Sequence, residues 1–247
     1  MTDSSAQTRR RFLQVFAVGI WPWQWFRPRT IGMGGGKFRI VRNGSDKRHY
    51  FWVHGNERTA REVLLDHMKT SPGRAFLVEN DERYLMVNGG RLDPNRMFSR
   101  EGAERNLKSL NTSWSPEQFN RVLDRLDRER PKFLSSVLPK DGKLLIAMHN
   151  NSQGYSVKDE VAISDQVSLR NEANPHEFML CTSSSDYEKL SQSPFNVVLQ
   201  KTAPKTDDGS LSRLTAARGL RYVNIEAGLG RAAEQKAMLD WVEQNLP

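Results

Sequence analysis

The sequence predicts a single α/β domain in which a mixed, mostly parallel sheet is flanked by helices. Short apolar runs typical of strands alternate with amphipathic stretches typical of helices along the body of the chain. Three of the apolar runs end in a residue that can take part in chemistry, namely His54, His149 and Glu226. Ligands bind outside the carboxyl ends of strands in open α/β sheets, so these three side chains are expected at one edge of the sheet.

The strands and helices are expected in alternation. The expected strands are Phe38–Val41, Tyr50–Val53, Ala75–Val78, Tyr84–Val87, Lys143–Met148, Phe178–Cys181, Val197–Gln200 and Tyr222–Ile225. The expected helices are Thr59–Met68, Arg100–Leu110, Pro116–Arg128, Asp186–Ser191, Leu211–Arg218 and Ala232–Gln244. Ser115 before Pro116 is typical of an N-cap followed by proline at the first helical position.

The basic charge of the chain is confined to its beginning. The 247 residues carry a net charge of +8, and residues 1–50 contain ten basic residues against two acidic ones. The remaining residues hold equal numbers of basic and acidic groups, whereas a nucleic-acid-binding domain needs a basic stripe on its folded body. We therefore expect no nucleic-acid partner. A single cysteine, Cys181, excludes an intrachain disulfide and a multi-cysteine metal site.

Residues 1–36 differ in character from the rest. Thr8–Gln14 followed by the apolar stretch Val15–Trp21 resembles a twin-arginine export signal, which predicts a periplasmic or exported protein. Three tryptophans follow without a small-residue cleavage site, so this segment is also a candidate for peripheral membrane contact (Trp21, Trp23 and Trp25). The alternative is a disordered basic tail on a cytoplasmic protein. Gly34–Gly36 is expected to be a flexible break, which places the folded domain at residues 37–247.

The strand-end residues have the composition of a metal site. Glu57 follows His54 by three residues, a spacing that lets both side chains reach one ion at a strand-to-helix turn. Two imidazoles and a carboxylate, with His149 as the third ligand, are typical of catalytic zinc. Glu226 would then be the general acid/base that carries the proton of the attacking water. The alternatives are a buried strand-end histidine at His149 and a helix-capping acid at Glu226.

A fourth element, Asp93-Pro94-Asn95-Arg96-Met97-Phe98, completes a set of motifs. In their order, these motifs resemble the zinc carboxypeptidase family and its aspartoacylase and succinylglutamate desuccinylase relatives. The resemblance implies Zn²⁺ on His54, Glu57 and His149, with Glu226 as the catalytic residue. It also implies that Asn95 and Arg96 bind a substrate carboxylate, and a guanidinium fork suits that task. The alternative for Arg96 is a structural or surface arginine.

Several assignments stay open on sequence alone. The family's carbonyl-polarising arginine has five candidates: Arg58, Arg61, Arg74, Arg83 and Arg91. The tyrosine found in some members has two candidates, Tyr155 and Tyr187. The remaining histidines, His49, His67 and His176, and the strand-end Cys181 are interpreted as structural.

The leading functional hypothesis is a zinc-dependent, carboxypeptidase-like hydrolase that cleaves an amide or peptide bond next to a carboxylate-bearing residue. A cell-envelope peptide would be a fitting substrate for an exported enzyme. The alternatives are an amidohydrolase of small N-acyl amino acids, a non-catalytic binding protein on the same fold, and a membrane-surface adaptor.

Overall fold

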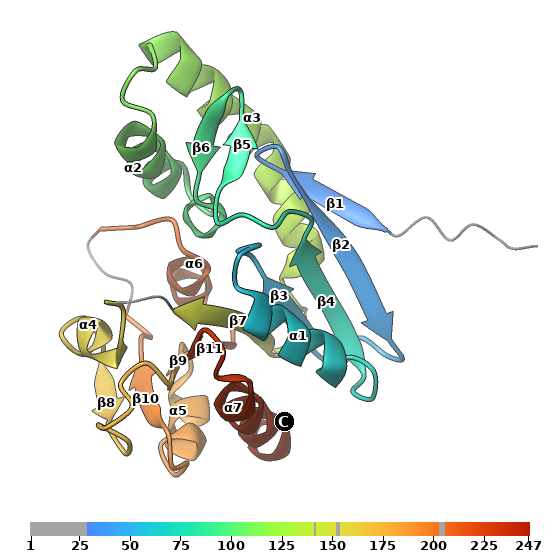
Figure 1. Ribbon diagram of the computed structural model, residues 1–247, viewed down its shortest axis with the longest axis vertical. Coiled ribbons are helices and arrows are strands. Elements are labelled where there is room, and N and C mark those ends of the chain that lie inside the picture. Colours follow the sequence, from blue (N-terminus) through green and yellow to red (C-terminus); the bar gives the residue numbers. More distant parts are fainter. Residues whose placement is uncertain (1–28, 141, 152–153, 203–205) are drawn as a thin grey trace, which may run out of the picture.

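The computed structural model describes residues 29–140, 142–151, 154–202 and 206–247 (Figure 1). Its core is a nine-stranded sheet in the order β1-β2-β4-β3-β7-β11-β9-β10-β8. The bounds of these strands are β1 Thr30–Met33, β2 Gly36–Asn43, β3 His49–Trp52, β4 Gly73–Val78, β7 Leu145–Asn151, β8 Gln166–Ser168, β9 Phe178–Cys181, β10 Asn196–Leu199 and β11 Tyr222–Gly228.

The four central strands β4, β3, β7 and β11 run parallel to one another. Antiparallel strands lie on both sides of this centre, with β1 and β2 beyond β4 and the parallel pair β9 and β10 beyond β11. Parallel strands covered on both faces should be buried along their length, and every residue of β3 and β7 is buried. The predicted fold class, a mixed α/β sheet flanked by helices, is confirmed.

Helices cover both faces of the sheet (Figure 1). On one face α1 (Arg58–His67) packs against α7 (Ala232–Asn245), and α5 (Ser184–Leu190) packs beside α7. On the other face α3 (Pro116–Val137) packs against β1 and α6 (Leu211–Ala217) packs against β11. The remaining helices are α2 (Arg100–Leu110), which lies along α3, the short α4 (Val157–Val161) and the 3₁₀ turn η1 (Pro94–Arg96).

Helix α3 is longer than the sequence pattern predicts. It continues from the expected end at Arg128 to Val137, through Pro131. Proline removes one helical hydrogen bond and costs about 3 kcal/mol in a helix interior. The residues beyond it offset this cost, because Phe133, Leu134 and Val137 are buried and the Phe133 ring packs edge-on against Phe38 with 5.0 Å between centroids. Packing of these side chains in the core therefore stabilises the helical residues that follow Pro131.

The folded domain begins earlier than expected. Residues 34–36 are not a flexible break, because β1 pairs with β2 in an antiparallel hairpin whose turn contains Gly34 and Gly35. Both glycines have positive φ angles, of 62° and 83°, a region that other residues avoid. The boundary at Lys37 is thus wrong, and Thr30 already belongs to the sheet. The twin-arginine-like motif and the three tryptophans lie outside the described residues.

One expected strand lies outside the main sheet. The run Tyr84–Val87 forms β5 (Leu85–Val87), which pairs only with β6 (Gly90–Leu92) as a two-stranded hairpin. This hairpin stands next to α2 and leads directly into the Asp93–Phe98 segment.

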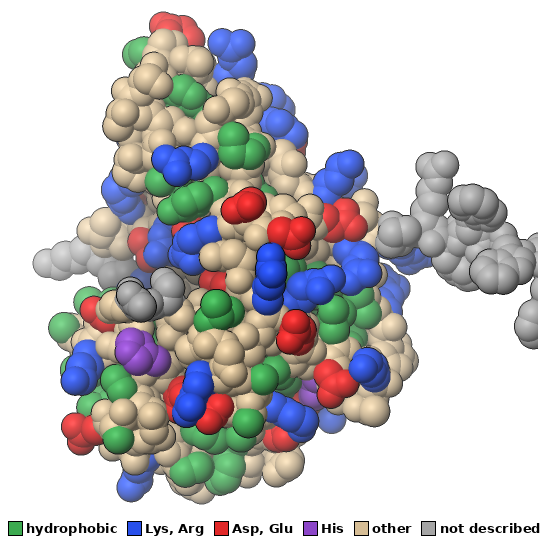
Figure 2. All heavy atoms as spheres, viewed as in Figure 1, with side chains coloured by type: hydrophobic (Ala, Val, Ile, Leu, Met, Phe, Trp, Pro, Cys, Tyr) green, Lys and Arg blue, Asp and Glu red, His purple; other side chains and the backbone are tan. Residues whose placement is uncertain are grey.

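The charge of the visible surface and the polarity of the helices agree with the amino-acid composition. Basic and acidic side chains are interspersed on the face seen in Figure 2. None of the helices in the described part of the chain is long and apolar enough to span a membrane.

Candidate metal centre

Three parallel strands deliver the predicted residues to one edge of the sheet. His49 of β3 pairs with Leu145 of β7, so that His54, just beyond the end of β3, lies near the carboxyl end of β7. In the next pair of strands, Glu226 of β11 lies directly beside His149 of β7. The structure therefore brings His54, His149 and Glu226 together, as the parallel arrangement requires.

Glu57 joins them through the turn between β3 and α1. The Trp52 indole donates to the Glu57 carbonyl at 2.9 Å, and the Glu57 amide donates to the His54 carbonyl at 3.2 Å. Gly55 allows the turn to be covered closely, because a Cβ atom there would lie 2.3 Å from the Asn80 carbonyl oxygen. This turn points His54 and Glu57 in the same direction.

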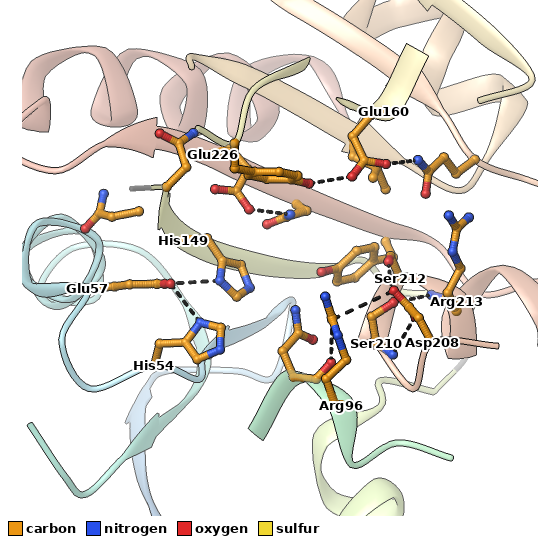
Figure 3. A pocket seen from close by; sticks show the side chains of 18 of the residues that line it. His54, Glu57, Arg96, His149, Glu160, Asp208, Ser210, Ser212, Arg213 and Glu226 are labelled. Atoms are coloured by element: carbon orange, nitrogen blue, oxygen red, sulfur yellow. Dashed lines mark hydrogen bonds and ion pairs between the residues drawn. The ribbon is translucent and has the colours of Figure 1, made fainter. Parts of the chain in front are cut away.

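The three predicted ligands form one buried group (Figure 3). His54, Glu57 and His149 each offer a donor atom within 4.8 Å of the others. The Nδ1 atom of His54 donates to Glu57 Oε1 at 2.7 Å, and the Nδ1 atom of His149 lies 3.1 Å from Glu57 Oε2. Both imidazoles thus present the same nitrogen to a single carboxylate.

Asp93 forms a second hydrogen bond with His54, at the ring nitrogen that does not face Glu57. Its Oδ1 atom accepts from His54 Nε2 at 2.8 Å, so both ring nitrogens of His54 face carboxylates. Such a carboxylate partner fixes the ring and leaves the other nitrogen directed at a metal. Arg83 lies against both acids, 3.4 Å from Glu57 Oε1 and 3.3 Å from Asp93 Oδ2. The sequence motif contained Asp93, but this contact was not predicted.

The charges of this group support one another. Burial lowers the pKa of His54, but the neighbouring Glu57 and Asp93 outweigh it and raise that pKa to about 9. Burial likewise opposes ionisation of Glu57, and the two histidines bring its pKa down to about 2. Glu57 and Asp93 are therefore anionic and His54 is an imidazolium. A divalent cation can take the place of the proton on Nδ1, because metal binding to histidine releases protons.

The residues present fit a zinc ion. Glu57 Oε2 is buried and has no hydrogen-bond partner among the described residues, although His149 lies nearby. An unsatisfied buried carboxylate oxygen is costly, and a metal ion at this point would satisfy it. Two imidazoles and one carboxylate leave a fourth tetrahedral position open, as in catalytic zinc sites, whereas Mg²⁺ and Ca²⁺ prefer oxygen ligands alone.

Glu226 lies beside this group without being part of it. It is only 6% exposed, and Asn224 donates to its Oε1 atom at 3.0 Å. Burial raises its pKa to about 7, with His149 opposing and Glu57 reinforcing the shift. A carboxyl group that exchanges its proton near neutral pH is suited to general acid/base chemistry.

Asn95 and Arg96 reach the same cavity from η1. Asp93 caps this turn by accepting from the Asn95 amide at 2.8 Å, and the Asn95 side-chain oxygen accepts from the Leu211 amide at 3.2 Å. The Asn95 oxygen is thus occupied. The Arg96 guanidinium donates to the Asn95 carbonyl at 2.9 Å and lies 3.8 Å from an Asp208 carboxylate oxygen.

A second cation, Arg213 of α6, was missed. It is 8% exposed, lines the cavity and has a buried terminal nitrogen, Nη1, with no hydrogen-bond partner in the described part of the chain. An unpaired buried guanidinium nitrogen in a cavity calls for an anionic or carbonyl ligand. The sequence carries no signal for this role, since an arginine in a short helix ordinarily faces water.

The structure reduces the number of candidates for the carbonyl-polarising arginine and for the tyrosine. Of the five arginines considered, Arg83 lines the cavity. Arg58 is exposed at the start of α1, Arg74 pairs with Asp46, and Arg61 and Arg91 stack over aromatic rings. Of the two tyrosines, Tyr155 lines the cavity, where its hydroxyl donates to Glu160 at 2.6 Å.

The remaining histidines and the cysteine lie elsewhere. His49 meets the Val137 carbonyl, His67 the Tyr50 hydroxyl and His176 the Tyr155 carbonyl. Cys181 is buried, and burial raises the pKa of its thiol.

All of the candidate residues face one cavity of about 300 Å³ (Figure 3). Its walls include the metal-binding group, Glu226, Asn95 and the three arginines Arg83, Arg96 and Arg213. In Figure 3, Arg96 and Arg213 lie on one side of His149 and Glu226. The cavity thus joins a metal-binding end to a cationic end.

Comparison with known proteins finds solved structures that resemble this chain in fold. No family model matches the sequence, and no curated protein matches it. Among solved structures, 11 chains match. They include a succinylglutamate desuccinylase/aspartoacylase from Rhodobacter sphaeroides, with 16% identity and a TM-score of 0.44 over 85% of this chain and 59% of that one. The ectoine utilization protein EutE (DoeB) from Ruegeria pomeroyi has 14% identity and a TM-score of 0.43 over 83% and 59%.

A candidate metallopeptidase from Shewanella baltica also matches, with 11% identity and a TM-score of 0.42 over 87% of this chain and 86% of that one. The present chain spans about three-fifths of the length of the first two proteins. These neighbours are of the kinds that the sequence motifs resemble.

Proposed function

We propose that this protein is a metal-dependent hydrolase that cleaves an amide bond next to a carboxylate-bearing residue. The observation that carries the proposal is the convergence of His54, Glu57 and His149 on one point, with Glu226 beside them in the same cavity. Zinc bound by such ligands lowers the pKa of a bound water to about 7 and polarises a carbonyl group.

Glu226 supplies the proton transfer. As a carboxylate it accepts a proton from the attacking water, and as a carboxylic acid it passes that proton to the leaving nitrogen. Both states are accessible near neutral pH because burial raises its pKa to about 7. Asn224, which donates to Oε1, fixes the orientation of the carboxyl group.

The cationic end of the cavity binds the substrate carboxylate. Arg96 and Arg213 both line it, and the Nη1 atom of Arg213, which has no partner among the described residues, is available for an anion. Arg83 is the arginine best placed to stabilise the oxygen that becomes negative during attack, since it already lies against Glu57. Hydrogen bonds from guanidinium to carboxylate are among the strongest in proteins.

A second candidate within this chemistry is an amidohydrolase of small N-acyl amino acids with acidic side chains. Two separate guanidinium groups in one cavity favour it, because a leaving amino acid with two carboxylates could engage Arg96 and Arg213 together. A carboxypeptidase substrate with one terminal carboxylate needs only one of them.

Metal content tests the proposal directly. The purified protein is expected to hold about one zinc ion per chain, and His149→Ala should lose most of it because two ligands bind zinc weakly. His176→Ala is the matched control, since His176 is not one of the three residues that converge on the ligand point and should leave zinc content unchanged. Equal zinc in His149→Ala and the parent protein would contradict the assignment.

A further inference from the structure

A second cavity adjoins the metal centre along the same two strands. It has a volume of about 540 Å³, larger than the first, and Asn151 lines both. Alternate residues of a strand share a face, so Asn151 of β7 follows His149 and Gly228 of β11 follows Glu226. Gly228 pairs with Asn151 as Glu226 pairs with His149. The second cavity therefore begins two residues beyond His149 and Glu226 along their strands.

The walls of this cavity are held in place by hydrogen bonds. Asn151 donates its side-chain amide to the His176 carbonyl, and the His176 ring meets the Tyr155 carbonyl at 2.7 Å. Arg231 donates to the buried carboxylate of Glu177 at 2.8 Å, which leaves both charges paired. A preformed cavity whose wall charges neutralise each other suits an uncharged group better than an ion.

Apolar surface is exposed in this cavity. Leu229, which follows β11 directly, is 64% exposed and lines the cavity together with Ala173 and Pro175. Gly228 contributes no side chain, and a Cβ atom there would already meet the Arg231 side chain at 3.2 Å. The small residues Ala173 and Gly228 and the exposed Leu229 thus offer an apolar surface that an apolar chain could cover.

The positions of the arginines and of Glu226 in the first cavity determine which way a bound substrate would lie. With its carboxylate at Arg96 or Arg213 and its amide at Glu226, the substrate sends its acyl side away from the cations. We propose that this acyl side is an extended apolar chain that lies in the second cavity along Asn151, Gly228 and Leu229. The inference rests on the proposed function and names its substrate class, an amino acid N-acylated by an apolar chain rather than by a short or charged group.

Binding measurements test this inference without relying on turnover. We would compare N-octanoyl-L-glutamate with N-acetyl-L-glutamate by calorimetry on the zinc-loaded Glu226→Gln protein. Burial of additional methylene groups favours the longer chain, so the octanoyl compound should bind at least about tenfold more tightly. Leu229→Asp, added to the same protein, should reduce that preference to about twofold or less.

Met86→Asp is the matched control, because Met86 is also 64% exposed but lies on the β5–β6 hairpin. It should keep the full preference for the octanoyl compound. Equal affinity for the two compounds, no binding of the octanoyl compound, or a preference that survives Leu229→Asp would overturn the inference. Tight octanoyl binding without hydrolysis by the parent protein would instead contradict the proposed function, so the two failures are distinguishable.

Discussion

At the scale of single residues, burial acts differently on two carboxyl groups of the same cavity. Burial raises the pKa of both Glu57 and Glu226, but Glu57 faces two imidazoles that bring its pKa down to about 2. Glu226 has one amide hydrogen bond and its pKa stays at about 7. The first is therefore an anion suited to binding a cation, and the second is suited to the proton transfer proposed for it.

The substitution Glu226→Gln separates these roles. Glutamine keeps the shape of the side chain but cannot carry the proton, so kcat should fall by about 10²–10⁴-fold. Zinc content should be retained, because Glu226 is not one of the three residues that converge on the ligand point. Hydrolysis at the parent rate would remove Glu226 from the mechanism, and loss of zinc would make it a ligand.

The contact between Asp93 and His54 predicts a measurable effect on metal affinity. Asp93→Asn removes the charge that holds His54 Nε2 at 2.8 Å, and zinc affinity should fall by about 10–100-fold in competition with a chelator. Asp208→Asn is the control, because Asp208 lines the same cavity but pairs with Arg96. Equal zinc affinity in the two variants would show that Asp93 does not support the ligand.

At the scale of elements, the last helix is attached to the sheet by a polar cluster far from the metal centre. Glu243 of α7 lies 2.8 Å from the Arg48 guanidinium and accepts from the Tyr50 hydroxyl at 2.8 Å. Arg48 is almost fully buried, and its NH2 group reaches the Leu246 carbonyl. The cluster joins α7 to the segment that begins β3, the strand that ends just before His54.

Removal of Glu243 should loosen this helix in a pH-dependent way. Burial opposes ionisation of Glu243, but His67 and Arg48 lower its pKa below the ordinary value. A lowered carboxyl pKa stabilises the fold above the unfolded value, and this stability is lost as pH falls through the folded value. Glu243→Gln should therefore cost about 2 kcal/mol of unfolding free energy at pH 7 and progressively less in acid.

Denaturant unfolding at several pH values measures this difference. Asp240→Asn is the matched control on the same helix, since Asp240 forms an exposed pair with Lys236 and should change stability by less than about 0.5 kcal/mol. A Glu243→Gln effect that is small, or equal at pH 7 and pH 3, would contradict the proposed attachment.

At the scale of the whole molecule, the sequence predicts best the strands themselves and the residues that lie at their carboxyl ends. All eight expected apolar runs form strands, and residues at the ends of parallel strands meet at one edge without further information. Arg213 could not be found in this way, because only tertiary packing decides whether a helical arginine faces water or a cavity. The hairpin of β1 was missed for a related reason: Gly34 and Gly35 are typical of a flexible linker and of a tight turn alike.

That hairpin sets the limit for shortening the chain. A protein that begins at Arg29 keeps β1 and should retain the stability and turnover of the full chain. A protein that begins at Lys37 loses Met33, which is fully buried, and the contact between the Gly34 amide and Glu129 at 2.8 Å. It should lose at least about 2 kcal/mol of unfolding free energy.

A comparison of the full chain with the protein that begins at Arg29 also tests the beginning of the chain. The twin-arginine-like motif lies within residues 1–28, so the protein that begins at Arg29 should stay in the cytoplasm of a bacterial host while the full chain is exported. Export of the shortened protein would contradict the export signal, whereas failure of both to leave the cytoplasm would favour the basic-tail interpretation. Because the residues proposed for catalysis lie on or beside strands β3, β7 and β11, soluble substrate should be hydrolysed at equal rates by both proteins.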